Sequence, residues 1–153
     1  MQITTFLKKG AIIEELKTAT KEAVLQELVA VLPLTARNED RDEIIKVLMA
    51  REKLGSTGIG DGIAIPHGKF RGLDELMISF GRSSTGIDFS ASDGKPVHLF
   101  FLMVAPENSA GQHLKILARI SRLLKDEALR KKLMKARSAA ELFEVIKEKD
   151  ETL

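Results

Sequence analysis

The chain contains no cysteine, no tryptophan and no tyrosine, and seven phenylalanines supply all of its large aromatic side chains. Without cysteine, disulfides, thiolate nucleophiles and cysteine-rich metal sites are excluded. The scarcity of aromatic side chains leaves little on which bases or sugars can stack, which argues against single-stranded nucleic-acid and carbohydrate surfaces. No apolar run approaches the roughly 20 residues that cross a bilayer, so we expect no membrane insertion.

Strong net charge is also missing, because 24 Lys and Arg stand against 22 Asp and Glu for a net charge of +2. This balance gives no electrostatic reason to expect a nucleic-acid partner. At 153 residues and 44% hydrophobic composition, the chain is predicted to form one domain over 1–153. The segment Met1–Lys9 lacks the basic start and long apolar stretch of a signal peptide, which predicts a cytoplasmic protein.

Apolar residues recur with a helical period on both sides of a central region rich in short apolar runs. Thr20 is a predicted N-cap, and two capping boxes begin at Ser109 and Ser138. The predicted helices cover about 21–32, 38 or 40 to 53, 109–124, 127–136 and 138–149. The predicted strands are 63–65, 76–80 and 97–104. The last of them is apolar on both faces, so we expect a central strand covered by helices on each side. This order predicts an α/β fold in which a small mixed sheet is sandwiched between helices.

The segment Gly55–Lys69 is the most informative part of the chain. Four glycines lead into a short apolar run, which stops at Pro66 and presents His67 beside Gly68. Histidine is the side chain whose ordinary pKa leaves a neutral nitrogen nucleophile available near pH 7. Flanking glycines let an anionic group approach the backbone and its N–H groups closely, although some also serve tight turns. The pattern indicates a histidine on an exposed loop, at the end of a predicted strand, that carries a phosphoryl group.

Four further residues are candidates to stabilise that phosphoryl group. Arg51 is a planar, permanently charged donor to phosphate oxygens, or else a solvated helix charge. Ser56 and Thr57 offer hydroxyl donors, with local turn or cap hydrogen bonds as the alternative. His113 follows a predicted helix start, where unpaired N–H groups favour an anion. His98, at the start of an apolar strand, is interpreted as structural or exposed.

Several other site classes do not fit the sequence. The three histidines are widely spaced and lack the pairing of a metal site, so we expect no metal and no cofactor. The glycine loop is not a P-loop, because no Gly-Lys-Ser/Thr follows it. It is not a dinucleotide-binding fingerprint either, because its glycines come before a predicted strand, whereas those of the fingerprint come after one. The basic stretch at 119–137 is interpreted as the solvated face of two helices, with binding to nucleic acid or to an acidic partner as the minority alternative.

The segments Ser56–Gly60 and Ile63–Gly68 resemble the active-site signature of enzyme IIA proteins of the fructose/mannitol type, from the bacterial phosphoenolpyruvate-dependent phosphotransferase system. The resemblance extends to Arg51-Glu52, the strand 100–106 and the helix that carries His113. It implies that His67 accepts a phosphoryl group and that Arg51 and His113 line the site. Within the family, the chain most resembles the nitrogen-regulatory branch.

The resemblance also implies the partners. The donor would be HPr or an HPr-like phosphocarrier, and the acceptors would be regulated target proteins or a IIB component. Two alternatives remain open. One is a sugar-transport IIA that passes its phosphoryl group to a separate IIB, and the other is a non-catalytic domain that binds an anion or nucleotide at the glycine loop.

Overall fold

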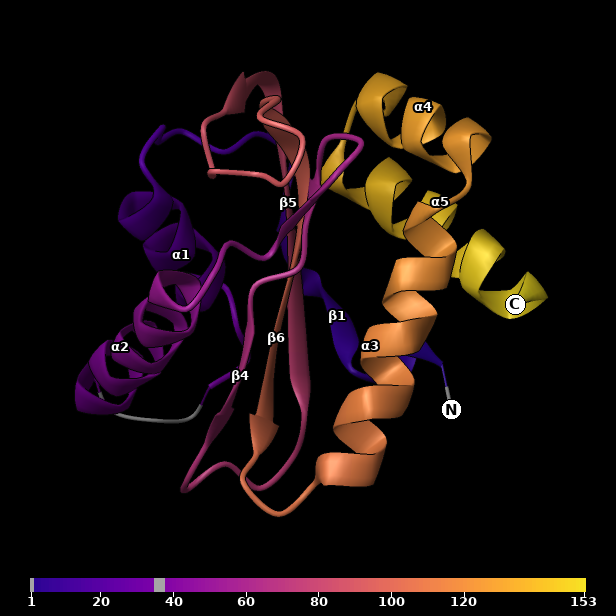
Figure 1. The fold of residues 1–153 in the computed structure, drawn as a ribbon. Coiled ribbons are helices and arrows are strands. Elements are labelled where there is room, and N and C mark those ends of the chain that lie inside the picture. The colour runs from indigo at the N-terminus through magenta and orange to yellow at the C-terminus, as the bar shows by residue number, and fades with distance from the viewer. Residues whose placement is uncertain (1, 35–37) are drawn as a thin grey trace.

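The computed structural model describes residues 2–34 and 38–153 and has three layers, with a central sheet between two sets of helices (Figure 1). Helices α1 and α2 cover one face, and α3, α4 and α5 cover the other. The elements are a 3-10 turn η1 (Ile3–Thr5), β1 (Leu7–Ile13), α1 (Lys21–Ala30), α2 (Asn38–Lys53), β2 (Gly58–Gly60), β3 (Ile63–Ala64), β4 (His67–Phe70), β5 (Met77–Ile87), β6 (Val97–Pro106), α3 (Ala110–Leu124), α4 (Glu127–Lys135) and α5 (Ala139–Thr152).

The sheet is mixed and is organised around β6. Strand order is β1-β5-β6-β3-β2, and β4 also pairs with β6. Strand β5 runs antiparallel to β6, whereas β3 and β4 both run parallel to it, one after the other along the same edge. Between them, the Pro66 carbonyl accepts the Met103 N–H at 2.9 Å, so pairing along β6 continues across the break. The residue after that break is His67.

Side chains of β6 alternate between two hydrophobic cores, as the period of a strand requires. Leu99, Phe101 and Met103 enter the core beneath α3, α4 and α5, whereas Phe100 and Leu102 enter the core beneath α1 and α2. All five side chains are buried. The expectation of a central strand covered by helices on both faces is therefore confirmed, and the predicted α/β fold class with it.

The predicted helices are present with small differences at their ends. The N-caps at Thr20 and Ser138 are confirmed, because their hydroxyls accept the N–H of Ala23 and Glu141. The predicted capping box at Ser109 is wrong, since its hydroxyl donates instead to the Pro106 carbonyl and makes no cap bond with the helix. In residues 2–34 and 38–153, no helix is long and apolar enough to cross a membrane.

Two buried charges join distant parts of the chain. The Arg82 guanidinium, 5% exposed, donates to the carbonyls of Glu14, Leu133 and Ala136 and so ties β5 to the end of α4.

Asp150 of α5 is fully buried. Its carboxylate accepts Arg119 Nε of α3 at 2.7 Å and the backbone N–H of Thr4 at 3.1 Å. These hydrogen bonds hold the N-terminal turn, α3 and α5 together.

Candidate phosphoryl-transfer site

His67 is the first residue of β4, so the expectation of an exposed loop position is wrong, and its side chain is half-buried. Its Nδ1 lies 2.6 Å from the Ile65 carbonyl oxygen. A carbonyl only accepts, so Nδ1 must carry the ring proton in the neutral imidazole. Nε2 is then the nitrogen with the free lone pair. The carbonyl of Ile65, two residues before His67, therefore defines which nitrogen can act as a nucleophile.

His113 of α3 lies beside His67, with 5.6 Å between the ring centroids and an angle of 57° between the planes. Its side chain is 7% exposed, and its buried Nδ1 has no hydrogen-bond partner among the described residues. Burial lowers the pKa of His113, and the nearby His67 and Lys69 lower it further. The ring is therefore neutral at pH 7 and can offer one N–H and one lone pair.

Arg51 completes the group from the last turn of α2. Its Nη1 donates to the Gly55 carbonyl at 2.8 Å, which leaves the other guanidinium donors available. Arg51, His67 and His113 line one open hollow of about 530 Å³, together with Val47, Ala50, Leu54, Gly68 and Lys69. The permanently charged members of this lining are the two cations Arg51 and Lys69. The structure thus brings together three of the five predicted site residues around a positively charged surface.

Ser56 and Thr57 do not join them, and their predicted role as phosphoryl donors is not supported by the structure. The Ser56 hydroxyl donates to the Phe89 carbonyl and accepts the Gly58 N–H at 3.0 Å. The Thr57 hydroxyl is buried and donates to the Glu52 carboxylate. A hydroxyl has one proton to donate, and both are already used within the loop.

The glycines of the loop also have local roles. Gly60 and Gly62 have φ of 98° and 76°, and Asp61 between them has φ of 58°, which forms the tight turn from β2 to β3. A Cβ on Gly58 would lie 2.9 Å from Ala91 Cβ, so that glycine permits close packing. The loop therefore folds as a hairpin, and its glycines do not line the hollow beside His67.

Two residues at or near the site were given no role from the sequence. Glu52 is buried on α2, and its spacing from Ile44 and Leu48 places it on the buried face of the helix, which was a usable signal. Lys69 lies two residues after His67 in β4 and so shares its face. That alternation appears only once β4 is identified as a strand.

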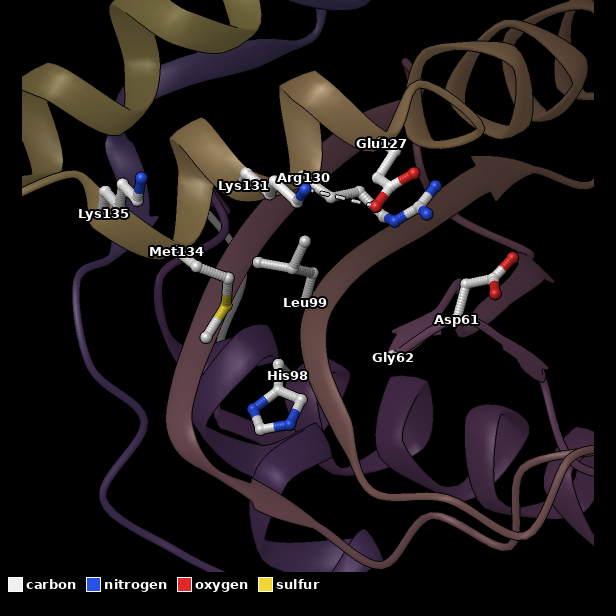
Figure 2. A pocket seen from close by; sticks show the side chains of 9 residues that line it. All are labelled: Asp61, Gly62, His98, Leu99, Glu127, Arg130, Lys131, Met134 and Lys135. Atoms are coloured by element: carbon white, nitrogen blue, oxygen red, sulfur yellow. Dashed lines mark ion pairs between the residues drawn. The ribbon is translucent and has the colours of Figure 1, made fainter.

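A second hollow, of about 310 Å³, lies between α4 and the sheet (Figure 2). His98 lines it, and its Nδ1 contacts the Ser83 carbonyl at 2.8 Å, which fits the structural role predicted for this residue. Two of the nearby cations have partners within the chain, because Lys131 pairs with Glu127 at 3.3 Å and Arg130 donates to the Leu124 carbonyl. These internal contacts favour the solvated-face interpretation of the basic stretch.

The chain matches a known protein family over nearly its whole length. Residues 5–149 match the family described as phosphoenolpyruvate-dependent sugar phosphotransferase system, EIIA 2. A nitrogen regulatory protein of Bradyrhizobium diazoefficiens is 45% identical over 147 residues, covering 95% of each chain. A fructose-specific EIIABC component of Bacillus subtilis is 39% identical over 150 residues, which are 98% of this chain and 24% of the relative.

A solved structure agrees with the sequence match. The nitrogen regulatory protein IIA-Ntr of Neisseria meningitidis superposes with a TM-score of 0.84 at 32% identity, covering 93% of this chain and 97% of that one. The family match, the identity to nitrogen regulatory proteins and the shared fold all point to one assignment. The chain belongs to the EIIA type 2 family of the phosphoenolpyruvate-dependent sugar phosphotransferase system, and it is most similar to the nitrogen regulatory proteins among the relatives described above.

Proposed function

We propose that this protein carries a phosphoryl group on His67 Nε2, accepts it from the phosphohistidine of HPr or an HPr-like carrier, and regulates target proteins according to its phosphorylation state. The observation that carries the proposal is the hydrogen bond from His67 Nδ1 to the Ile65 carbonyl. This bond holds the ring in the tautomer that keeps a lone pair on Nε2, in a hollow shared with Arg51 and His113.

Transfer would follow an in-line displacement at phosphorus. The Nε2 lone pair forms the new N–P bond while the donor's N–P bond breaks, and that electron pair returns to the donor nitrogen. Bond types on the two sides are the same, so the step is nearly balanced and reversible. Because phosphoryl transfer needs little covalent help from the protein, the positions and charges around the equatorial oxygens determine most of the rate.

Arg51 and His113 are proposed to stabilise those oxygens. Arg51 retains guanidinium N–H groups beyond the one bound to Gly55, and such groups bind phosphate oxygens in pairs. His113 lines the same hollow, and its neutral ring can donate an N–H to a phosphoryl oxygen. A hydrogen bond to that anionic oxygen would favour protonation of the ring.

Regulation would follow from charge. The phosphoryl group adds roughly −1.5 to −2 charges to a hollow whose permanent charges are Arg51 and Lys69. A protein that docks on this surface would therefore meet a positive surface before transfer and a nearly neutral one after it, with no change of fold. The similarity to nitrogen regulatory proteins supports a regulatory use of the switch.

The second candidate is a sugar-transport IIA that passes its phosphoryl group to a separate IIB component. The 39% identity to a fructose-specific EIIABC component favours keeping this candidate. Phosphorylated protein mixed with a fructose-type IIB separates the two functions, because onward transfer supports transport and its absence supports regulation.

The deciding experiment is phosphorylation by a phosphorylated HPr-type carrier, followed by intact-mass measurement and site mapping. We expect a gain of one phosphoryl group in the wild-type protein and in His98→Gln, and no gain in His67→Gln. An equal gain in His67→Gln would contradict the assignment. No gain in the wild-type protein would favour the non-catalytic anion-binding alternative.

A further inference from the structure

Glu52 is a buried carboxylate that lies behind the proposed site. Its side chain is 2% exposed and pairs with Lys21 Nζ at 3.3 Å. The same carboxylate accepts the Thr57 backbone N–H at 3.1 Å and the Thr57 hydroxyl through its second oxygen. Lys21 is itself fixed, because its ammonium lies 4.7 Å from the centroid of the Phe89 ring. A carboxylate this buried is stable only because each of its neighbours donates to it.

From Glu52, an unbroken series of hydrogen bonds leads to the imidazole of His67. The Thr57 carbonyl accepts the Ile65 N–H at 3.1 Å. The Ile65 carbonyl in turn accepts His67 Nδ1 at 2.6 Å. Each contact holds a residue whose other backbone group makes the next contact. The Glu52 carboxylate therefore acts, through Thr57 and Ile65, on the position of the oxygen that selects the His67 tautomer.

Glu52 also limits the movement of Arg51. The loop after α2 closes through the hydrogen bond from the Gly55 N–H to the Glu52 carbonyl, at 3.1 Å. The Gly55 carbonyl accepts Arg51 Nη1 at 2.8 Å. Tethering Thr57 to the Glu52 side chain holds the far end of the same loop. Both the nucleophile and its proposed cationic partner thus depend on this one loop.

We propose that Glu52 is a positioning residue for phosphoryl transfer: through Thr57 and Ile65 it keeps the proton of His67 on Nδ1 and so keeps Nε2 available as the nucleophile. The inference rests on the proposed function of His67. It adds a residue that does not line the hollow and does not touch the reacting atoms.

The experiment compares Glu52→Ala, Glu52→Gln and Thr57→Val with Thr57→Ser and Glu43→Gln. Thr57→Ser keeps both donors to the carboxylate. Glu43→Gln makes the same chemical change at an exposed carboxylate on the same helix, which contacts Lys46 at 3.5 Å. The first readout is the His67 tautomer, measured by nitrogen-15 and proton NMR of the imidazole without any phosphoryl donor. The second is the rate of phosphoryl uptake from phosphoramidate, a small donor that needs no protein docking.

We expect the wild type, Thr57→Ser and Glu43→Gln to hold the Nδ1–H tautomer. In Glu52→Ala and Thr57→Val, both tautomers should be populated, and uptake should slow by about 10- to 100-fold, as expected for displaced reacting groups. Glu52→Gln, which keeps the volume and one acceptor oxygen, should lie between these extremes. If Glu52→Ala fails to fold, Glu52→Gln and Thr57→Val still test the proposal.

Folded Glu52→Gln and Thr57→Val variants with the wild-type tautomer and the wild-type rate would overturn the proposal. Failure of the proposed function is a separate result. In that case the wild-type protein takes up no phosphoryl group, while the tautomer measurement still tests the link between Glu52 and His67.

Discussion

Gly68 offers a direct test of how closely α2 must approach the strand that carries His67. A Cβ built on Gly68 lies 3.0 Å from Val47 Cγ1 and 3.7 Å from Leu48 Cδ2. The first distance is shorter than comfortable carbon–carbon contact, so Gly68→Ala should move α2 and β4 apart by a few tenths of an ångström. Val47 and Arg51 lie one turn apart on α2, so the same movement shifts Arg51 relative to His67.

The size of both effects follows from that displacement. Mild overpacking of this kind costs about 1 kcal/mol of folding free energy, which lowers the midpoint of thermal unfolding by about 2–4 °C for a chain of this size. A misplacement of 1 Å costs on the order of 100-fold in rate, so a shift of a third of that should slow phosphoryl transfer about 5-fold. Transfer is therefore expected to slow while the protein remains folded.

The assay is the initial rate of phosphorylation by a phosphorylated HPr-type carrier, alongside thermal unfolding. Gly10→Ala is the matched control, because a Cβ on Gly10 of β1 meets no atom within 4 Å. We expect this control to match the wild type in both measurements. If Gly68→Ala transfers at the same rate as Gly10→Ala, the separation of α2 and β4 does not position the site, and the reasoning is wrong.

Three further predictions concern charged groups. Arg51→Lys keeps the charge but loses the planar fork, so transfer rates should fall by about 10-fold; an unchanged rate would remove Arg51 from the mechanism. The pKa of His113 is lowered in the folded chain, so as the pH falls below about 6.5 the unfolded chain takes up a proton there before the folded chain does. The wild type should then lose stability relative to His113→Asn, and parallel urea-denaturation curves across that pH range would refute this. Arg82→Met leaves three carbonyls without their donor and should cost about 3–5 kcal/mol; a loss below about 1 kcal/mol in urea denaturation would show that these bonds are readily replaced.

Local signals explain why the helices and the central strand could be predicted. Thr20 and Ser138 cap their helices through hydrogen bonds three residues away, so the sequence holds all the information that these helix starts need. The apolar run in β6 predicted a strand buried on both faces. Neither prediction depended on knowing which distant segment lies alongside.

The missed elements depend on distant partners. Strand β1 contains Lys8, Lys9 and Gly10, and its register with β5 shifts between Leu7 and Ile12, which hides the alternation of a strand. Strand β4 is short and partly exposed, and it exists because it pairs with the end of β6. A parallel pairing of this kind leaves no local pattern.

At the site, the sequence predicted the positions of the two histidines and the arginine better than the roles of the two hydroxyl side chains. His67, Arg51 and His113 were candidates from their chemistry, the family resemblance implied that they share one site, and they lie together. Ser56 and Thr57 have the right chemistry for phosphate, but their single protons are used by Phe89 and Glu52. Which acceptor a hydroxyl contacts depends on tertiary packing, so its role could not be read from its neighbours in sequence.

The buried carboxylate of Asp150 connects the C-terminal helix to the helix that carries His113, so the proposed site depends on the C-terminal end of the chain. Helix α3 carries both Arg119, which binds this carboxylate, and His113, which faces His67. A truncation that removes residues 150–153 would leave the Arg119 guanidinium without its counterion and would free Thr4 as well. In shortened versions of the protein, or in fusions that disturb its last turn, the rate of phosphoryl transfer should therefore fall, although that turn contributes no atom to the proposed site.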